Sequence, residues 1–272
     1  MMEAALAMRK GDEKMSFGLV LGGGSVRGLA HIGVLKVLKK YQIPIDFIAG
    51  TSMGGAIGGL VSAGIDIEEI EQFVLVIPSI HIAEVGYGSR SMLGGNKIYT
   101  MLLQFLEQKG LGDMRVQDTE IPFRPVAVDL NSGSEYIFDH GNLGVSLRAT
   151  TAIPGMFAPV EFEGRLLVDG GLLNNLPADV AREAGMDHVL AVDVGRERHM
   201  KEPKSMFDVL QRSMDVLLAD NVKRRVPYAD IILKPEVGQY PAFELTKMKA
   251  CIEAGEREAE ANIKQIADLL EG

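Results

Sequence analysis

Short apolar runs alternate along the chain with longer amphipathic stretches, and this alternation predicts strands and helices that follow one another. The apolar runs predict strands at residues 17–21, 45–49, 125–129, 136–138, 166–168, 188–194 and 230–233. The amphipathic stretches predict helices at 29–41, 56–64, 66–76, 97–109, 177–184, 206–224 and 243–270. A β-loop-α-β start of this kind is typical of an α/β fold, with a mainly parallel sheet and helices on its faces.

The same pattern predicts the domain organisation. Residues 1–15 carry only a short apolar stretch among acidic residues, so we expect a poorly ordered leader rather than a signal peptide. Residues 16–272 are expected to form a single α/β domain, with a helical C-terminal part at about 205–272. The stretch 77–95 is rich in Gly and Pro, and it is expected to be either a mobile loop over a site or an ordinary surface loop.

Composition narrows the classes of partner. The 272 residues carry a formal net charge of -9, which argues against a nucleic-acid partner because phosphate contacts need clustered Lys and Arg. Lys36, Lys39 and Lys40 gather near one predicted helix end, where basic side chains favour the helix dipole. This basic cluster is compatible with a transient contact with a membrane surface. No apolar run reaches the roughly 20 residues of a membrane span.

Cysteine usage bears on compartment and cofactors. Cys251 is the sole cysteine, so the chain has no intrachain disulfide, and we expect a cytoplasmic protein, peripheral to the membrane at most. Nothing in the sequence has the spacing of a metal-ligand cluster, and no cofactor is expected.

The pentapeptide Gly50-Thr51-Ser52-Met53-Gly54 stands between a predicted strand and a stretch of small residues. A Ser at a sharp turn between strand and helix fits the nucleophile elbow, which lifts the hydroxyl clear of the backbone. The glycines on either side let the turn close. Ser52 is therefore a candidate nucleophile, although many structural turns share this pattern.

A second glycine-rich segment, residues 22–28 (GGGSVRG), follows the first predicted strand and precedes a helix. Exposed backbone N–H groups at such a place favour negative charge, and in acyl transfer they would stabilise an oxyanion. The same glycines resemble a dinucleotide-binding loop, but Arg27 occupies its third glycine position. Asp46 lies near the start of the second strand, whereas a ribose-binding acid belongs at its end. The nucleotide interpretation therefore fits less well.

A serine nucleophile needs a proton acceptor, and the sequence offers two. Asp169 ends an apolar run and is followed by Gly170 and Gly171, at the strand end where open α/β sheets place their sites. Desolvation would raise the basicity of this carboxylate. The alternative is a triad in which Ser52 and Asp169 are joined by His199, in the order found in α/β-hydrolases.

Taken together, residues 22–28, 50–54 and 169–171 resemble the patatin-like phospholipases, in their order and at plausible separations. The stretches 148–154 and 169–177 are also similar to that family, and the likeness covers roughly residues 17–195. The resemblance implies a three-layer α/β/α fold and a Ser–Asp dyad, with Ser52 as nucleophile and Asp169 as proton acceptor.

The resemblance also implies which residues complete the site. The oxyanion donors would be the N–H groups of Gly23, Gly24 and Ser25, where Ser25 replaces a glycine that many members carry. The supporting positions are Gly22, Arg27, Gly28, Gly50, Gly54, Gly170 and Gly171. The implied activity is hydrolysis of carboxylic esters in (lyso)phospholipids or related lipids, without a metal. A lipid-binding or regulatory protein with a vestigial site remains the alternative from another class.

Overall fold

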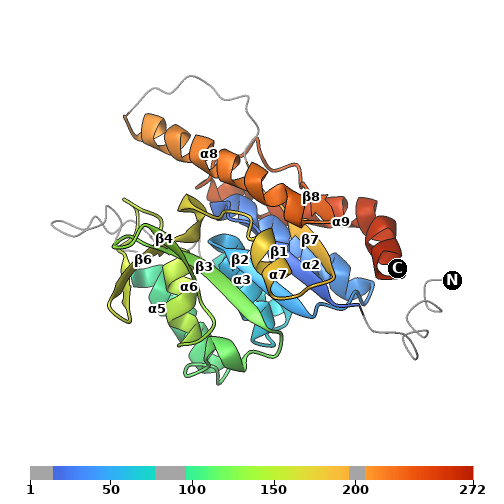
Figure 1. Ribbon diagram of the computed structural model, residues 1–272, viewed down its shortest axis with the longest axis horizontal. Helices are drawn as coiled ribbons and strands as arrows, with labels where there is room; N and C mark the ends of the chain where they lie inside the picture. The colour runs from blue at the N-terminus through green and yellow to red at the C-terminus, as the bar shows by residue number, and fades with distance from the viewer. Residues whose placement is uncertain (1–14, 77–95, 196–205, 272) are drawn as a thin grey trace.

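The computed structural model describes residues 15–76, 96–195 and 206–271 of the chain (Figure 1). All but the last residue of the predicted leader, the loop at 77–95 and the alternative base His199 lie outside these described residues.

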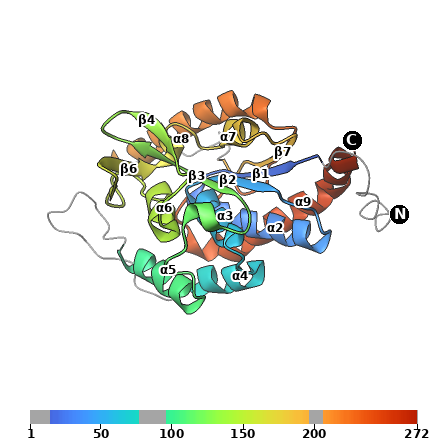
Figure 2. The ribbon, with the colours of Figure 1, turned by 60° about the horizontal axis from the view of Figure 1, so that its bottom comes forward.

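Among the described residues, eight strands form one sheet at the centre of the molecule (Figures 1 and 2). Its strands are β1 (Phe17–Leu21), β2 (Phe47–Thr51), β3 (Phe123–Asp129), β4 (Ser134–Ile137), β5 (Val160–Phe162), β6 (Arg165–Asp169), β7 (His188–Val192) and β8 (Ile231–Leu233). They lie in the order β5-β6-β3-β2-β1-β7-β8, and β4 pairs with β3. The run from β8 to β3 is parallel, whereas β4, β5 and β6 are antiparallel to their neighbours. The sheet is therefore mainly parallel, as predicted.

Helices cover both faces of this sheet (Figure 2). Alternate residues of β1 show the division, because Leu19 and Leu21 pack into one apolar cluster and Val20 into another. The larger cluster is covered by α2 (Ala30–Lys40), α3 (Met53–Ser62), α4 (Ile67–Val76), α5 (Asn96–Gln108), α6 (Leu143–Thr150) and α9 (Met248–Glu271). The smaller cluster is covered by α7 (Ala178–Glu183) and α8 (Met206–Arg225). This arrangement confirms the three-layer α/β/α fold.

Several elements differ from the predicted ones. Helix α6 and strand β5 were not expected, and α3 begins at Met53 rather than at Ala56. The loop predicted after β1 contains a 3-10 helix, η1 (Ser25–Leu29). These elements are short, and a sequence pattern needs several periods before it separates a helix or strand from a loop.

The register of β3 brings two distant segments to the same level of the sheet. Strand β2 pairs along the first part of β3 and ends with Thr51 opposite Val126. The remainder of β3 pairs with β6, which runs in the opposite direction and ends with Asp169 opposite Ala127. Because Ala127 directly follows Val126, the last residues of β2 and β6 lie at adjacent levels on the same strand.

Candidate active site

Ser52 occupies the sharp turn between β2 and α3. Its backbone has φ 54° and ψ −126°, a left-handed conformation that strains a residue with a side chain. The Ser52 N–H donates to Oγ1 of Thr150 at 2.9 Å, and that hydroxyl donates to the carbonyl of Val126 at 2.6 Å. The end of α6 therefore holds this strained turn against β3.

Asp169 is the last residue of β6, and only 6% of its surface is exposed. Burial raises the pKa of its carboxyl to about 6, while the Ser52 side chain and the Gly171 N–H act in the opposite direction. The Gly171 N–H donates to Oδ1 at 2.8 Å and so fixes the carboxylate on the turn η4 (Gly170–Leu172). A carboxylate whose pKa lies near neutrality is a better base than an exposed one.

Asp169 reaches the site by a different route from the predicted one. Sequence reasoning placed it at the carboxyl end of a strand on the pattern of a parallel sheet. Strand β6 is antiparallel to β3, and its carboxyl end meets the site because β3 extends beyond β2. The sequence therefore predicted correctly that Asp169 ends a strand, but the strand was expected to be parallel to its neighbour and is antiparallel.

The glycine loop lies against Ser52. A Cβ added at Gly23 would be 3.1 Å from that of Ser52, so the loop backbone passes close to the elbow. The Gly22 N–H donates to the Val192 carbonyl at 3.1 Å, and the Gly23 N–H donates to the Asn175 carbonyl at 3.0 Å. The Gly23 donor, predicted to face substrate, is thus already engaged. Gly24 is the N-cap of η1 and Ser25 its first residue, and both line the same pocket.

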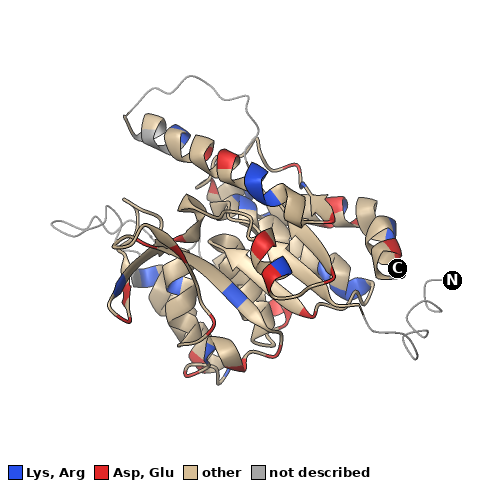
Figure 3. Ribbon diagram, in the orientation of Figure 1, with Lys and Arg blue, Asp and Glu red and all other residues tan. Residues whose placement is uncertain are grey.

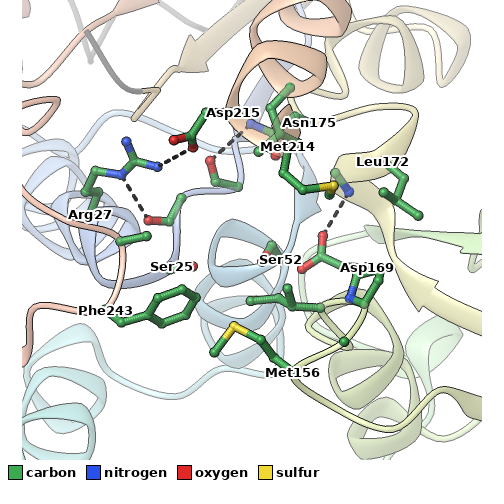
Figure 4. Close-up of a pocket in the computed structure, with 18 residues that line it drawn as sticks. Ser25, Arg27, Ser52, Met156, Asp169, Leu172, Asn175, Met214, Asp215 and Phe243 are labelled. Carbon is green, nitrogen blue, oxygen red and sulfur yellow. Dashed lines mark hydrogen bonds and ion pairs between the residues drawn. The ribbon is translucent and has the colours of Figure 1, made fainter. Parts of the chain in front are cut away.

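Two side chains hold this loop from behind. His31 is fully buried, and its Nε2 lies 2.7 Å from the Gly22 carbonyl. Burial lowers the pKa of His31 to about 4, so the ring is neutral and Nε2 carries the hydrogen that it donates. The Arg27 Nε donates to the Gly24 carbonyl at 3.4 Å, and its guanidinium pairs with Asp215 of α8 at 3.9 Å (Figure 4). Arg27 therefore orients the loop and connects it to α8.

One pocket of about 180 Å³ joins these parts, with Ser52 and Asp169 both in its wall (Figure 4). Gly23, Gly24 and Ser25 line it on the side of the glycine loop. The rest of the wall is largely apolar and includes Ile153, Met156, Leu172, Met214, Leu218 and Phe243. Such a wall suits an aliphatic chain.

The remaining predicted residues have structural places around the pocket. Gly50 lies within β2, Gly54 within the first turn of α3, and Gly28 within η1, where a side chain would collide with Met53. Asp46 accepts from the Phe17 N–H at the start of β1, at the opposite end of that strand from the glycine loop. The nucleotide interpretation is therefore wrong about Asp46. No histidine is among the described residues that line the pocket.

Sequence reasoning missed three residues that hold the site: Thr150, Asn175 and Asn221. Thr150 and Asn175 lie in stretches that resemble the family, but no local pattern shows their hydrogen bonds. Asn221 lies in α8 and is only 9% exposed. A polar residue on the buried face of an amphipathic helix was the available signal, because a buried amide requires partners.

The chain is similar to a family of known proteins. The family model described as patatin-like phospholipase matches residues 19–182, which include the glycine loop, the elbow and Asp169. The chain belongs to the patatin-like phospholipase family. This is a family of lipid hydrolases, and its match with the chain ends before α8 begins.

The patatin-like chain has relatives in animals, fungi and bacteria. It is 32% identical over 190 residues to the neuropathy target esterase sws of Drosophila melanogaster, covering 67% of this chain and 13% of the fly protein. It is 33% identical over 197 residues to an uncharacterised NTE family protein of Mycobacterium bovis, covering 71% of this chain and 53% of that one. A lysophospholipase of Eremothecium gossypii is 32% identical, over 66% of this chain and 12% of its own. The chain therefore matches only part of each relative.

Solved structures share the fold at low sequence identity. VipD from Legionella pneumophila matches with a TM-score of 0.61 and 12% identity, over 98% of this chain and 73% of VipD. Human GIVD cytosolic phospholipase A2, in complex with a fluorophosphonate inhibitor, matches with a TM-score of 0.54 and 13% identity, over 99% of this chain and 62% of that chain.

None of the described helices combines the length and apolar character needed to span a bilayer.

Proposed function

We propose that this chain hydrolyses carboxylic esters of lipids through Ser52 and Asp169. The observation that carries the proposal is their meeting in one apolar-walled pocket, where a strained serine faces a buried carboxyl whose pKa is raised to about 6. Strained backbone conformations and shifted pKa values are concentrated at functional sites, because catalysis needs preorganised residues and titratable groups whose pKa suits proton transfer.

The proposed reaction has two steps. Asp169 accepts the proton of Ser52 as Oγ attacks the ester carbonyl, and the alcohol leaves with that proton. Water, deprotonated by Asp169, then attacks the acyl carbon bound to Ser52. The bond between Oγ and the acyl group breaks, the fatty acid leaves, and Oγ takes the proton back from Asp169. The N–H groups of Gly24 and Ser25 stabilise the oxyanion in both steps, and each such donor contributes on the order of 10²–10³ in rate. Gly23 contributes less than the sequence suggested, because its N–H already donates to Asn175.

The proposed substrates are lysophospholipids or related lipid esters. Two observations support this class: the apolar wall of the pocket, and relatives named as a lysophospholipase and as an esterase. Transient contact with a lipid surface is part of the proposal. Val216 and Leu217 are 63% and 55% exposed on α8, the same helix that contributes Met214 and Leu218 to the pocket.

A fluorophosphonate probe tests the nucleophile directly. The wild-type protein should be labelled at Ser52, and Ser52→Ala should not be labelled. The control is Ser213→Ala, because Ser213 is exposed and its hydroxyl bonds within α8. Labelling of Ser52→Ala at the wild-type rate would contradict the assignment.

A second comparison separates the dyad from the triad. Asp169→Asn should abolish hydrolysis of a lysophospholipid, whereas His199→Ala should stay near the wild-type rate. Loss of activity in His199→Ala would instead support the Ser–Asp–His alternative. A folded wild-type protein that cleaves no short- or long-chain ester would favour a vestigial, lipid-binding site.

A further inference from the structure

Asn221 joins α8 to the turn that carries Asp169. It lies in the second half of the helix, buried against the site, and its Nδ2 donates to the carbonyl of Gly171 at 2.7 Å. Gly171 is the residue whose N–H fixes the Asp169 carboxylate. The Asn221 side chain therefore holds the peptide between Gly171 and Leu172. The peptide before it carries the N–H that contacts the Asp169 carboxylate.

The other end of the same amide reaches the glycine loop through Asn175. Oδ1 of Asn221 accepts from the Asn175 N–H at 3.1 Å. Asn175 in turn accepts the Gly23 N–H on its carbonyl at 3.0 Å, and its Nδ2 donates to the Gly23 carbonyl at 3.1 Å. We name Asn221 and Asn175 the amide bridge, because together they connect Gly171 to Gly23.

The residue before Asn175 ties the elbow into this bridge. The Asn174 carbonyl accepts from Oγ1 of Thr51, which precedes Ser52, at 2.7 Å. The Asn174 N–H donates to the Gly170 carbonyl at 2.9 Å. The nucleophile, the base and the glycine loop are thus all fixed to one short segment, and Asn221 holds that segment from α8.

The chemistry of position 221 is demanding. The Gly171 carbonyl can only accept and the Asn175 N–H can only donate, so the side chain between them must offer one donor and one acceptor. An amide does this with a single planar group. Asp offers no donor when ionised, and Leu or Ala offers neither group. Removing the amide would also leave two buried backbone groups without partners.

We propose that Asn221 is a positioning residue of the active site, supplied by α8 from outside the part of the chain that matches the family. This inference rests on the proposed function. Asn221 touches no reacting atom; it sets the separation of the Asp169 turn from the glycine loop. Displacement of catalytic groups by about 1 Å costs on the order of 10² in rate, so a loosened bridge lowers turnover rather than binding.

The test compares Asn221→Ala with Asp220→Ala. Asp220 is the neighbouring residue on the exposed side of α8, where it pairs with Arg224. In Asn221→Ala, kcat for a lysophospholipid and the rate of fluorophosphonate labelling should fall about 10- to 100-fold, with KM within about twofold of wild type. Asp220→Ala should behave as wild type. Circular dichroism checks that both variants are folded.

Hydrogen exchange supplies a readout that does not depend on activity. Peptides covering residues 17–29 and 165–176 should both exchange faster in Asn221→Ala. Asn221→Asp retains an acceptor for the Asn175 N–H but loses the donor to Gly171, so the 165–176 peptide should respond more than the 17–29 peptide. Unchanged exchange of both peptides in Asn221→Ala overturns the inference.

The remaining outcomes are distinct from one another. Faster exchange with an unchanged labelling rate also overturns the inference, because the bridge would then be structural only. A 10- to 100-fold rise in KM with unchanged kcat in Asn221→Ala also overturns the inference, because the bridge would then affect binding rather than turnover. Absence of labelling at Ser52 in the wild-type protein overturns the proposed function instead, and the exchange of the two peptides still decides whether the amide bridge exists.

Discussion

Asp169 loses its hydration when the chain folds, and the charged form of the carboxyl loses more than the neutral form. Its pKa therefore rises from 3.8 to about 6, against the opposing effect of the Gly171 N–H and the Ser52 side chain. A base of this pKa is ionised at neutral pH and still accepts a proton more readily than a surface carboxylate. We expect this single shift to govern the pH dependence of both the proposed hydrolysis and the stability.

The first consequence is the pH dependence of hydrolysis. Because only the ionised carboxylate accepts the Ser52 proton, kcat/KM should rise with pH and reach half its plateau near pH 6. The measurement is initial rates on a soluble ester between pH 4.5 and 8. A midpoint near 4 would mean that Asp169 is hydrated in the working enzyme, which would contradict the proposed role of burial.

The second consequence is that this group makes the fold less stable as pH rises, whereas it makes the proposed hydrolysis faster. The folded chain holds the Asp169 proton more tightly than the unfolded chain, so this group favours folding below about pH 4. That contribution, roughly 2–3 kcal/mol, is lost as pH rises from about 4 to about 6 and stays lost above it. Asp169→Asn should therefore unfold at higher urea concentration than wild type at pH 8, with little gain at pH 4.

Asparagine keeps an acceptor for the Gly171 N–H, so this gain is not offset by a lost hydrogen bond. Asp113→Asn is the matched control, since Asp113 is exposed and its replacement should leave the free energy of unfolding unchanged at both pH values. A wild-type protein more stable than Asp169→Asn at pH 8 would contradict the assigned shift.

At the residue scale, local sequence patterns pointed to candidate site residues, whereas hydrogen bonds between distant residues could not be predicted from the sequence. Ser52 and Asp169 each stand beside glycines at the end of an apolar run, so short sequence windows marked them as candidates. The engaged Gly23 N–H depends on Asn175, which lies 152 residues away. Asn221 depends on partners 46 and 50 residues away. No window contains such pairs.

At the element scale, α9 packs on α2 through backbone contact. A Cβ at Gly255 of α9 would collide with the Ala30 carbonyl, and one at Gly33 of α2 would collide with the Ile252 carbonyl. The two glycines let the helices cross more closely than side chains allow. Because α2 begins where the glycine loop ends, this crossing also fixes the start of the helix behind the site.

Gly255→Ala tests this crossing. In an open helix the change would stabilise by about 1 kcal/mol, since alanine is the better helix former. Here overpacking against fixed backbone opposes it and costs on the order of 1–3 kcal/mol or more, so the net effect should be destabilising. Urea denaturation measures it, with Glu253→Ala, on the exposed side of α9, as the control. An increase in stability would show that the helices can separate freely.

Some elements were predicted closely and others were not. Strand β1 has its predicted bounds, and those of α2 and α8 differ from the prediction by at most one residue at each end, whereas the longest helix, α9, begins at Met248 rather than at residue 243. By contrast, α6 has eight residues and β5 has three, which is too few to establish a period. Strand β3 starts at Phe123, two residues before the predicted start at Pro125. The proline was taken as a boundary, whereas the strand continues through it.

At the scale of the whole molecule, the C-terminal part completes a core that the family motifs do not cover. Ile231, Leu233, Cys251, Ile252 and Ile266 are buried in the larger apolar cluster, beside β1 and α2. A chain ending at Gly195 would expose that face of the cluster and the β7 edge that β8 covers. Such an exposed edge and apolar surface favour aggregation.

We therefore expect a chain shortened to end at Gly195 to be insoluble or to lack a cooperative thermal transition. Expression in soluble form and circular dichroism decide this. The matched control ends at Leu269, which removes only the last two residues of α9 and Gly272. A folded, probe-labelled protein ending at Gly195 would mean that the motif-bearing part is sufficient by itself.

Charge on the folded molecule is distributed rather than gathered (Figure 3). The basic cluster at Lys36, Lys39 and Lys40 pairs with acidic side chains that α2 does not contain: Glu71, Glu256, Asp66, Glu68 and Glu260. These pairs raise the pKa of each lysine and neutralise the patch. The sequence shows only the lysines, because their partners come from other elements. Contact with a lipid surface therefore has little support from this cluster.

Strand β3 extends beyond the end of β2, and this extension fixes how Ser52 and Asp169 are spaced. Hydrogen-bonded strands slide only in whole residues, and a step of one residue moves a side chain by about 3.3 Å and turns it to the opposite face. The separation of Ser52 from Asp169 can therefore change only in steps of one residue. It is set by the number of β3 residues that pair with β2 before the pairing with β6 begins. Insertions in the loops between these strands leave that number unchanged. A single insertion or deletion within β3 does not, and no adjustment elsewhere restores an intermediate spacing.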